Sequence, residues 1–541
     1  MDLVPHTTPS SGRMTPRSAK ALAAIVPVVG GLLFLFNFVG WTASSFDRVQ
    51  KLRRYGEDMS VATTDYFERR APSGAPAVRL SSVEAQQYGL ALEASMLDAE
   101  RRLGLRPWQF WRTLPDPPAR PGPVVSRSND DVGRARLTAL GFRLLGGVAP
   151  FLPLWLAALA CLPVLVWTVR EMARAGHPFA GAAFAVACAS SPFFVESMAL
   201  PYSAFGFYLV GLLAITAFAV YAIMGAPDAR GFLLRAVVLG PVLAVCALCR
   251  DGILLALPGL LLAMVLGARR LARGGRSWLL VGLALAAAAL PYALVRPATH
   301  HEMWTGVWEG LGDFDRTKGH VWSDTVAVKL LTDAGLDAGM PAGVEMFDRE
   351  LASPEKEAFF RRLVLDDVRS DPLWYLAILG KRVAATVSQD ELLVLGGRSA
   401  RSEQARRGPE APIPTNQGRI RFFYRLVPTA DAIGLGPWRL ALPLVVLWLL
   451  GASFLGLAAC ERAERPALAV AACVAGAALP LPVLITTAGA LETEAFVLVY
   501  FLAFAFVVER AGQALCSWRG AEDGARRARD RGPRGHGLEP A

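Results

Sequence analysis

The stretch Ala236–Gly267, AVVLGPVLAVCALCRDGILLALPGLLLAMVLG, decides the fold, because it is apolar except for Arg250 and Asp251 in its middle. One helix of this length, at about 1.5 Å per residue, would exceed a hydrocarbon core about 30 Å thick. We therefore expect two short helices, each below the roughly 20 residues that a full crossing needs, joined near the outer membrane boundary. An ionisable pair at that depth is costly, which makes it a candidate functional site.

The composition of the whole chain is that of a polytopic membrane protein. Of its 541 residues, 53% are hydrophobic and 19% are charged, and the mean hydropathy is +0.37. The net charge of +10 comes from arginines in short connections and in the tail Arg519–Arg534. That distribution is typical of cytoplasmic loops beside anionic lipid, so we expect a lipid bilayer as partner and no nucleic acid. The seven cysteines lie in or beside apolar blocks, so no disulfide framework is predicted.

The fold class expected is an all-α polytopic membrane protein with about ten transmembrane helices. The predicted spans are 21–43, 147–169, 179–200, 204–224, 236–249, 253–267, 278–295, 438–458, 467–485 and 495–508. Arginines occupy alternate connections, which predicts that both termini are cytoplasmic. Block 21–43 is expected to be an uncleaved anchor rather than a signal peptide, because it is longer than a usual signal-peptide core.

The chain then divides into the following parts. A basic cytoplasmic N-terminus (1–20) precedes the first span, the segment 147–295 holds spans two to seven, 438–510 holds the last three, and 511–541 is a basic tail expected to be disordered. The segments 44–146 and 296–437 are expected to be extracytoplasmic. Both are predicted to carry amphipathic membrane-surface helices, over 81–103 and 373–387, with another helix over 359–368.

This layout resembles the GT-C superfamily of membrane glycosyltransferases, which includes aminoarabinose transferases and protein mannosyltransferases. The resemblance rests on Glu84-Ala-Gln-Gln-Tyr88 and on Arg250-Asp251-Gly252-Ile253-Leu254. It implies an enzyme that moves a sugar from a polyprenyl-phosphate donor to an extracytoplasmic lipid, glycan or protein acceptor, with no cofactor required. The chain departs from the family in having Glu rather than Asp at position 84, and in lacking an arginine-tyrosine-proline cluster near Glu492–Phe496.

Acidic residues of the first long segment are candidates for the general base. The resemblance assigns this role to Glu84, because a carboxylate can take the proton from an incoming hydroxyl. Asp130 and Asp131 are the second choice, and they are also suited to holding a divalent metal ion. All three residues are equally explained as helix caps.

Arg250 is the candidate ligand of the donor phosphate. A guanidinium binds phosphate through paired hydrogen bonds and stabilises the charge on the leaving group. Glu196 lies inside an apolar block, close in sequence to the turn at Tyr202, and a carboxylate there needs a partner such as Arg250. The alternative interpretation is an ion pair of Arg250 with Glu196 or Asp251 and no ligand.

The second long segment begins with a dense run of His, Trp, Gly and Asp. A substrate pocket is predicted here, because tryptophan rings stack on sugars. The residues expected to line it are Glu196, Tyr202, Asp251, His300, His301, Trp304 and Asp313. A metal site that includes His320 and a purely structural loop are the other two interpretations.

Three functions compete with glycosyl transfer. A multi-span transporter or flippase, an envelope polysaccharide polymerase or ligase, and a non-catalytic GT-C-like membrane protein also fit many spans and large outer segments.

Overall fold

In the computed structural model, the described residues are helices joined by short turns, and no strand occurs among them. They comprise residues 25, 28–32, 34, 35, 133, 137, 140, 152–190, 194, 198, 204–225, 227–295, 303–314, 316–321, 324–336, 354–388, 465–486 and 495–530. Within this part of the chain, seven helices are long and apolar enough to cross a bilayer. The polytopic membrane architecture is therefore confirmed, whereas a total of ten spans stays a prediction.

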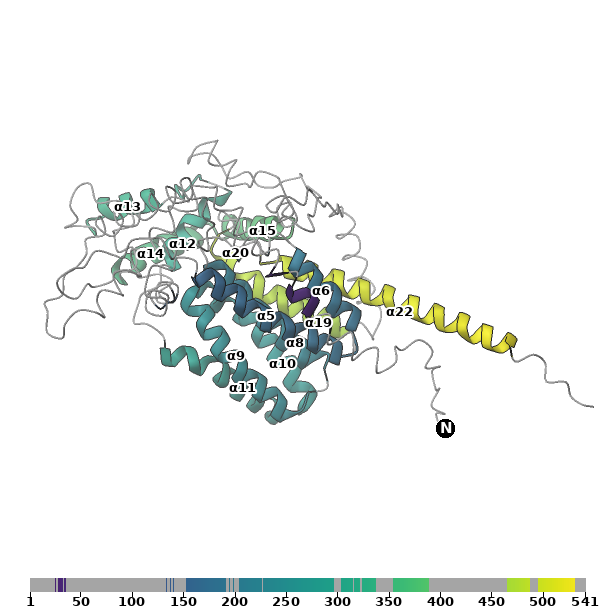
Figure 1. The fold of residues 1–541 in the computed structure, drawn as a ribbon. Coiled ribbons are helices and arrows are strands. Elements are labelled where there is room, and N and C mark those ends of the chain that lie inside the picture. The colour runs from purple at the N-terminus through teal and green to yellow at the C-terminus, as the bar shows by residue number, and fades with distance from the viewer. Residues whose placement is uncertain are drawn as a thin grey trace, which may run out of the picture.

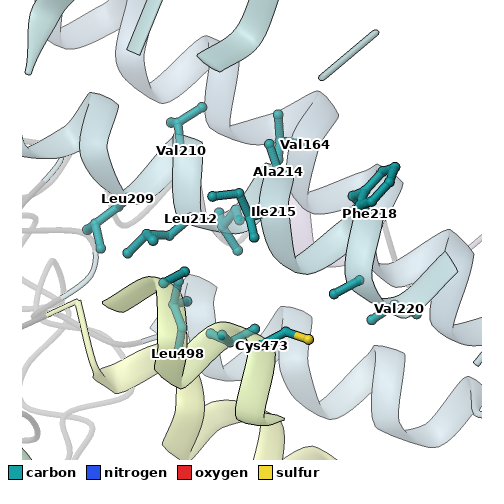
Figure 2. Packing of buried hydrophobic residues seen from close by; sticks show 14 of the residues in the cluster. Val164, Leu209, Val210, Leu212, Ala214, Ile215, Phe218, Val220, Cys473 and Leu498 are labelled. Carbon is teal, nitrogen blue, oxygen red and sulfur yellow. The ribbon is translucent and has the colours of Figure 1, made fainter. Parts of the chain in front are cut away.

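Helix α8 (Ala204–Ile223) lies at the centre of the bundle. Its sequence is apolar on every side, and its span from Gly206 to Ile223 is buried throughout. A helix of that kind needs protein all around it. It contacts its neighbours α5 (Leu152–Arg174), α9 (Ala229–Cys249), α10 (Leu257–Leu271) and α19 (Arg465–Ala478). Figure 2 shows Ile215 of α8 between Val164 of α5 and Cys473 of α19.

The polar interruption divides the quoted stretch as predicted. Helix α9 ends at Cys249, Arg250 has an extended backbone (φ −156°, ψ 100°), and the 3-10 helix η3 (Asp251–Ala256) leads directly into α10. The predicted shortness of the two helices is wrong, because both spans contain 21 residues. Helix α9 begins before Ala236, at Ala229, because the side chain of Asp228 accepts a hydrogen bond from the Gly231 N–H and caps the helix.

Several arginines mark one end of the bundle, which we call the arginine end. Arg270, in the last turn of α10, donates to the carbonyl groups of Ala222 and Gly225 at the end of α8. Arg235 near the start of α9 pairs with Glu171 near the end of α5 at 2.8 Å. The opposite end, where α9 gives way to η3 at Arg250, is called the break end.

The remaining helices follow the same up-and-down alternation. The Ala180 N–H, in the first turn of α6 (Pro178–Ser190), donates to Glu509 of α22 (Val497–Asp530) at 2.8 Å. Helix α11 (Gly275–Val295) follows α10 at the arginine end, and α20 (Pro480–Leu484) follows α19 and contacts η3 at the break end. The first predicted block runs in the direction of α6, since Gly30 packs on Ala185 and the rings of Phe34 and Phe194 lie 6.2 Å apart.

The two described ends of the interval 388–465 lie at opposite ends of the bundle. Helix α15 (Pro372–Ser388) contacts α20 at the break end, whereas α19 begins at Arg465 at the arginine end. A further crossing between them stays a prediction. The predicted span 438–458 falls in that interval but lies outside the described residues.

A small group of helices covers the break end, and we call it the cap (Figure 1). It consists of α12 (Met303–Gly310), η4 (Leu311–Asp313), α13 (Asp324–Asp333), α14 (Pro354–Ser370) and α15. It has its own apolar core, built around Trp308, Leu331 and Phe360. Ile485, just after α20, packs against both this core and that of the bundle.

The two helices predicted in this segment are confirmed and extend slightly beyond their expected bounds. Helix α14 covers the predicted 359–368, and α15 covers 373–387. Asp371 accepts a hydrogen bond from the Trp374 N–H at 3.0 Å, and Pro372 occupies the first position of α15, which is a common way to begin a helix. In contrast to the disorder predicted from 511, α22 continues to Asp530 and projects beyond the other helices in Figure 1.

Candidate functional site

The structure describes four of the residues predicted to form a site, namely Arg250, Asp251, Trp304 and Asp313. The others lie outside the described residues: Glu84, Asp130, Asp131, Glu196, Tyr202, His300 and His301. Nothing in the described residues therefore tests the base assignment or the proposed pairing of Glu196 with Arg250.

Arg250 lies at the break end of the bundle, where it ends α9. Its backbone N–H donates to the carbonyl of Cys246 at 2.7 Å, and its side chain is partly exposed. The last carbonyls of a helix carry partial negative charge, so a guanidinium is stabilised at this position. Arg250 is the cationic residue among the four described candidates. It is half-buried and lies at the end of the apolar helix α9.

Two close backbone approaches place other segments beside this break. A Cβ added to Gly252 would lie 3.1 Å from Cδ2 of Leu481, so η3 packs tightly on α20. A Cβ added to Gly133 would lie 2.7 Å from the carbonyl carbon of Leu248, two residues before Arg250. Gly133 itself follows Asp131 by two residues in the sequence. The first long segment thus meets α9 next to the predicted phosphate ligand.

A second guanidinium also contacts α20. Arg382 of α15 has a fully buried side chain, and its Nε lies 3.3 Å from Oδ2 of Asp313. Its Nη1 donates to the carbonyl of Val483 at 2.9 Å, and the hydroxyl of Thr486 donates to Oδ1 of Asp313 at 3.0 Å. Burial lowers the pKa of Arg382 from its ordinary value, and the charge of Asp313 opposes that shift.

The close fit around this pair leaves no space for a side chain at Gly310. A Cβ there would lie 2.8 Å from Nη2 of Arg382 and 2.9 Å from Cβ of Thr486. Asp313, predicted to line a substrate pocket, thus bonds to Arg382 and Thr486 where the cap meets the bundle. Arg382 is not among the site residues predicted from the sequence. The pattern that could have identified it is its position on the helix face opposite Leu373 and Leu376.

Trp304, another residue predicted to line the pocket, contacts other parts of the cap. The backbone N–H of Trp304 donates to Glu357 at 2.8 Å, and the guanidinium carbon of Arg361 lies 5.8 Å from its ring centroid. The N–H and the hydroxyl of Thr305 donate to the same carboxylate, so α14 caps the start of α12. These contacts favour the structural interpretation for the described part of this loop.

His320 lies in a layer of aromatic rings. Its ring centroid is 5.4 Å from that of Trp308 and 5.7 Å from that of Trp374, with which it stacks. Its Nε2 lies 2.9 Å from Oδ2 of Asp367, and Nζ of Lys318 lies 4.6 Å from the Trp374 ring centroid. Burial lowers the pKa of His320 from its ordinary value of 6.5, although Asp367 acts in the opposite direction.

The described residues contain no group of three His, Cys, Asp or Glu side chains arranged to hold a metal ion. The candidate ligands Asp130, Asp131, His300 and His301 lie outside that part of the chain. A divalent metal therefore remains a prediction for those segments. A scan against protein-family models finds no match, and searches among curated proteins and solved structures find none either.

Proposed function

We propose that this chain is a GT-C-like glycosyltransferase, which moves a sugar from a polyprenyl-phosphate donor to an acceptor on the extracytoplasmic side of a bacterial inner membrane. The observation that supports this proposal best is the position of Arg250. Arg250, a half-buried residue, stands at the end of an apolar span, at the end of the bundle that the cap covers. The headgroup phosphate of a lipid carrier occupies that level of a bilayer, whereas its chain requires the apolar surface below.

Arg250 is better suited to bind the phosphate than Arg382. The guanidinium of Arg382 is fully buried and already interacts with Asp313 and the Val483 carbonyl. Arg250 immediately precedes η3, which also contacts α20, and the residue is half-buried rather than fully buried. Arg382 then holds the cap over the site, while Arg250 binds the donor.

The reaction needs a carboxylate beside the bound phosphate. The acceptor hydroxyl would attack the anomeric carbon, its proton would pass to that carboxylate, and the bond from the sugar to the phosphate oxygen would break. The carrier phosphate then leaves with the electron pair, and Arg250 stabilises its charge. Glu84 is the base that the resemblance assigns, but the contact of Gly133 with Leu248 favours Asp131 or Asp130.

Binding of the carrier tests this proposal directly. The chain would be purified in lipid nanodiscs, and its affinity for a polyprenyl phosphate measured by native mass spectrometry. Arg250→Ala should weaken binding at least tenfold, because a charge-assisted hydrogen bond contributes about 1.5–3 kcal/mol. Arg276→Ala removes an exposed arginine at the arginine end and is the matched control, which should bind as the wild type does.

A turnover assay separates the effect of a substitution on carrier binding from its effect on catalysis. Cell-envelope membranes containing the chain would be supplied with a radiolabelled polyprenyl-phosphate sugar, and release of the carrier phosphate would be followed. Asp131→Asn and Glu84→Gln are compared, and the variant that abolishes release while still binding carrier identifies the base. Equal carrier affinity of Arg250→Ala and wild type would overturn the proposal.

A further inference from the structure

Helix α15 is apolar on its outward face as well as on most of its inward face. Outward, Leu373 is 76% exposed, Leu376 60% and Val383 38%. Inward, Ile378 is buried in the core of the cap, together with Arg382 and Thr386. A helix on the surface of a water-soluble protein instead turns polar and charged residues toward solvent.

The outward face is continuous along the helix. Residues three, four and seven apart lie on one side of an α-helix. The exposed residues that follow this spacing are Leu373, Leu376, Ala377, Gly380, Val383 and Ala384. Lys381 is exposed beside them and is the charged neighbour of this stripe. An apolar stripe of this kind marks an interaction site.

The inner face of α15 fixes the helix at the break end of the bundle. Arg382 donates to the Val483 carbonyl of α20, and the hydroxyl of Tyr500, near the start of α22, donates to the Val387 carbonyl. Leu484 of α20, the helix that α15 contacts, is 39% exposed as well. Figure 1 shows α15 beside α20, across the end of the bundle.

We propose that α15 lies in the membrane surface, with the stripe from Leu373 to Ala384 among the acyl chains of one leaflet. The lipid bilayer is the occupant that the position favours, because membrane-spanning helices of the same chain end where α15 is anchored. Lys381 can keep its ammonium group among the headgroups while its stem lies along the apolar face. This proposal does not depend on the enzymatic function.

One consequence concerns the site. Arg382 ties α15 to α20, and Leu481 of α20 packs on Gly252 beside Arg250. A helix held at the level of the headgroups therefore sets the height of Arg250 relative to the lipid phosphates.

Spin-label accessibility in nanodiscs tests the placement of α15. A nitroxide would be attached to Leu376→Cys in a chain carrying Cys460→Ala and Cys516→Ala; the other cysteines are buried. Leu283→Cys on α11, where Leu283 is 48% exposed, provides the reference for the bilayer interior. Arg369→Cys on α14, whose native side chain is 73% exposed, provides the aqueous reference. A label at Leu373→Cys repeats the measurement one turn away.

The expected result is that oxygen relaxes the labels at 373 and 376 more than a water-soluble nickel chelate does, with a ratio several-fold above that at 369. Nickel accessibility equal to that at 369 would overturn the proposal. Protection from both reagents would also overturn it, since the face would then be covered by protein. Spin–spin broadening in that case would identify a second copy of the chain as the cover.

Discussion

Arg382 and Asp313 form a buried ion pair within the cap, and each also bonds to the end of the bundle, Arg382 to Val483 and Asp313 to Thr486. Their Nε and Oδ2 atoms lie 3.3 Å apart, and the exposures of the two side chains are 0% and 1%. Neither charge is stable at such a position without the other, because desolvation costs several kcal/mol per ion. The pair, together with Val483 and Thr486, is therefore a fixed connection between α15, η4 and the end of α20.

Removing one charge of this pair should destabilise the protein more than removing both. We expect Arg382→Met or Asp313→Leu alone to lower the free energy of unfolding by about 3–5 kcal/mol, since the remaining charge is buried unpaired. The double variant should recover most of that loss. Thermal unfolding in nanodiscs, followed by tryptophan fluorescence, measures all three.

The control for this comparison is the exposed pair of Arg369 and Asp366. Their side chains are 73% and 64% exposed, and the charged atoms lie 3.7 Å apart. Arg369→Ala should change stability by less than about 1 kcal/mol. If the Arg382 and Asp313 single variants behave like this control, the pair does not hold the cap.

Gly259 should be intolerant of any larger side chain. A Cβ there would lie 2.7 Å from Cβ of Ala477, and Gly476 of α19 faces it across the crossing of α10 and α19. Small residues at such crossings let the helix backbones approach closely. We expect Gly259→Leu to destabilise the protein by at least about 1–3 kcal/mol through overpacking.

Gly282 on α11 provides the matched control, because nothing lies within 4 Å of a Cβ added there. Gly282→Leu should be neutral or slightly stabilising, since leucine favours a helix more than glycine does. The measurement compares the melting temperatures of the two variants in the same lipid. An equal decrease in melting temperature for both would contradict the close crossing of α10 and α19.

The sequence predicts the membrane helices well because their signal is local. A continuous apolar run such as 204–224 predicts the bounds of α8 to within a residue or two. The polar interruption at Arg250 separates α9 from α10 as expected. The error in the length of α9 has a local cause as well. Arg230 and Arg235 look like a connection, but a helix can carry arginines beyond the hydrocarbon core, where Arg235 pairs with Glu171.

The contacts of the cap could not be predicted from the sequence in the same way. The ion pair of Arg382 and Asp313 joins residues 69 positions apart, and no periodicity reports such a contact. The run of His and Trp was interpreted as a pocket because its composition suits sugars. That prediction stays untested at His300 and His301, which lie outside the described residues. Trp308 and His320, in the described part of the segment, pack against each other in the cap, a contact that depends on where α14 and α15 fold back.

The cap should lose stability as the pH falls below the ordinary pKa of histidine. Burial lowers the pKa of His320 in the folded protein below 6.5, so the unfolded chain binds its proton first on acidification. The stabilisation is present above pH 6.5 and is lost as the pH falls through the lower, folded value. One proton contributes a slope of at most about 1.4 kcal/mol per pH unit.

His320→Phe isolates this contribution, because phenylalanine can pack against Trp308 and Trp374 but does not titrate. Its melting temperature should be lower than that of the wild type at pH 7.5, since the bond to Asp367 is lost. Between pH 6.5 and pH 5, however, it should fall less steeply. Parallel pH profiles for the two proteins would show that His320 is not the group that titrates.

The chain should cross the membrane between Ser388 and Arg465. Since α15 is anchored at the break end and α19 rises from the arginine end, the two positions should lie on opposite sides of the bilayer. Alkaline phosphatase needs the oxidising conditions outside the cytoplasm to form its disulfides. A fusion after Ser388 should therefore be active and a fusion after Arg465 inactive.

The same reporter tests the direction of insertion. Arginine-rich short connections favour the cytoplasm, so a fusion after Leu271, at the end of α10, should be inactive like the one after Arg465. Activity after both Ser388 and Arg465 would mean that the interval 388–465 does not cross, which contradicts the alternation of the helices. Activity after Leu271 and Arg465 but not after Ser388 would preserve that alternation and invert the whole protein. Arg250 would then face the cytoplasm, and a donor on the outer leaflet could not reach it.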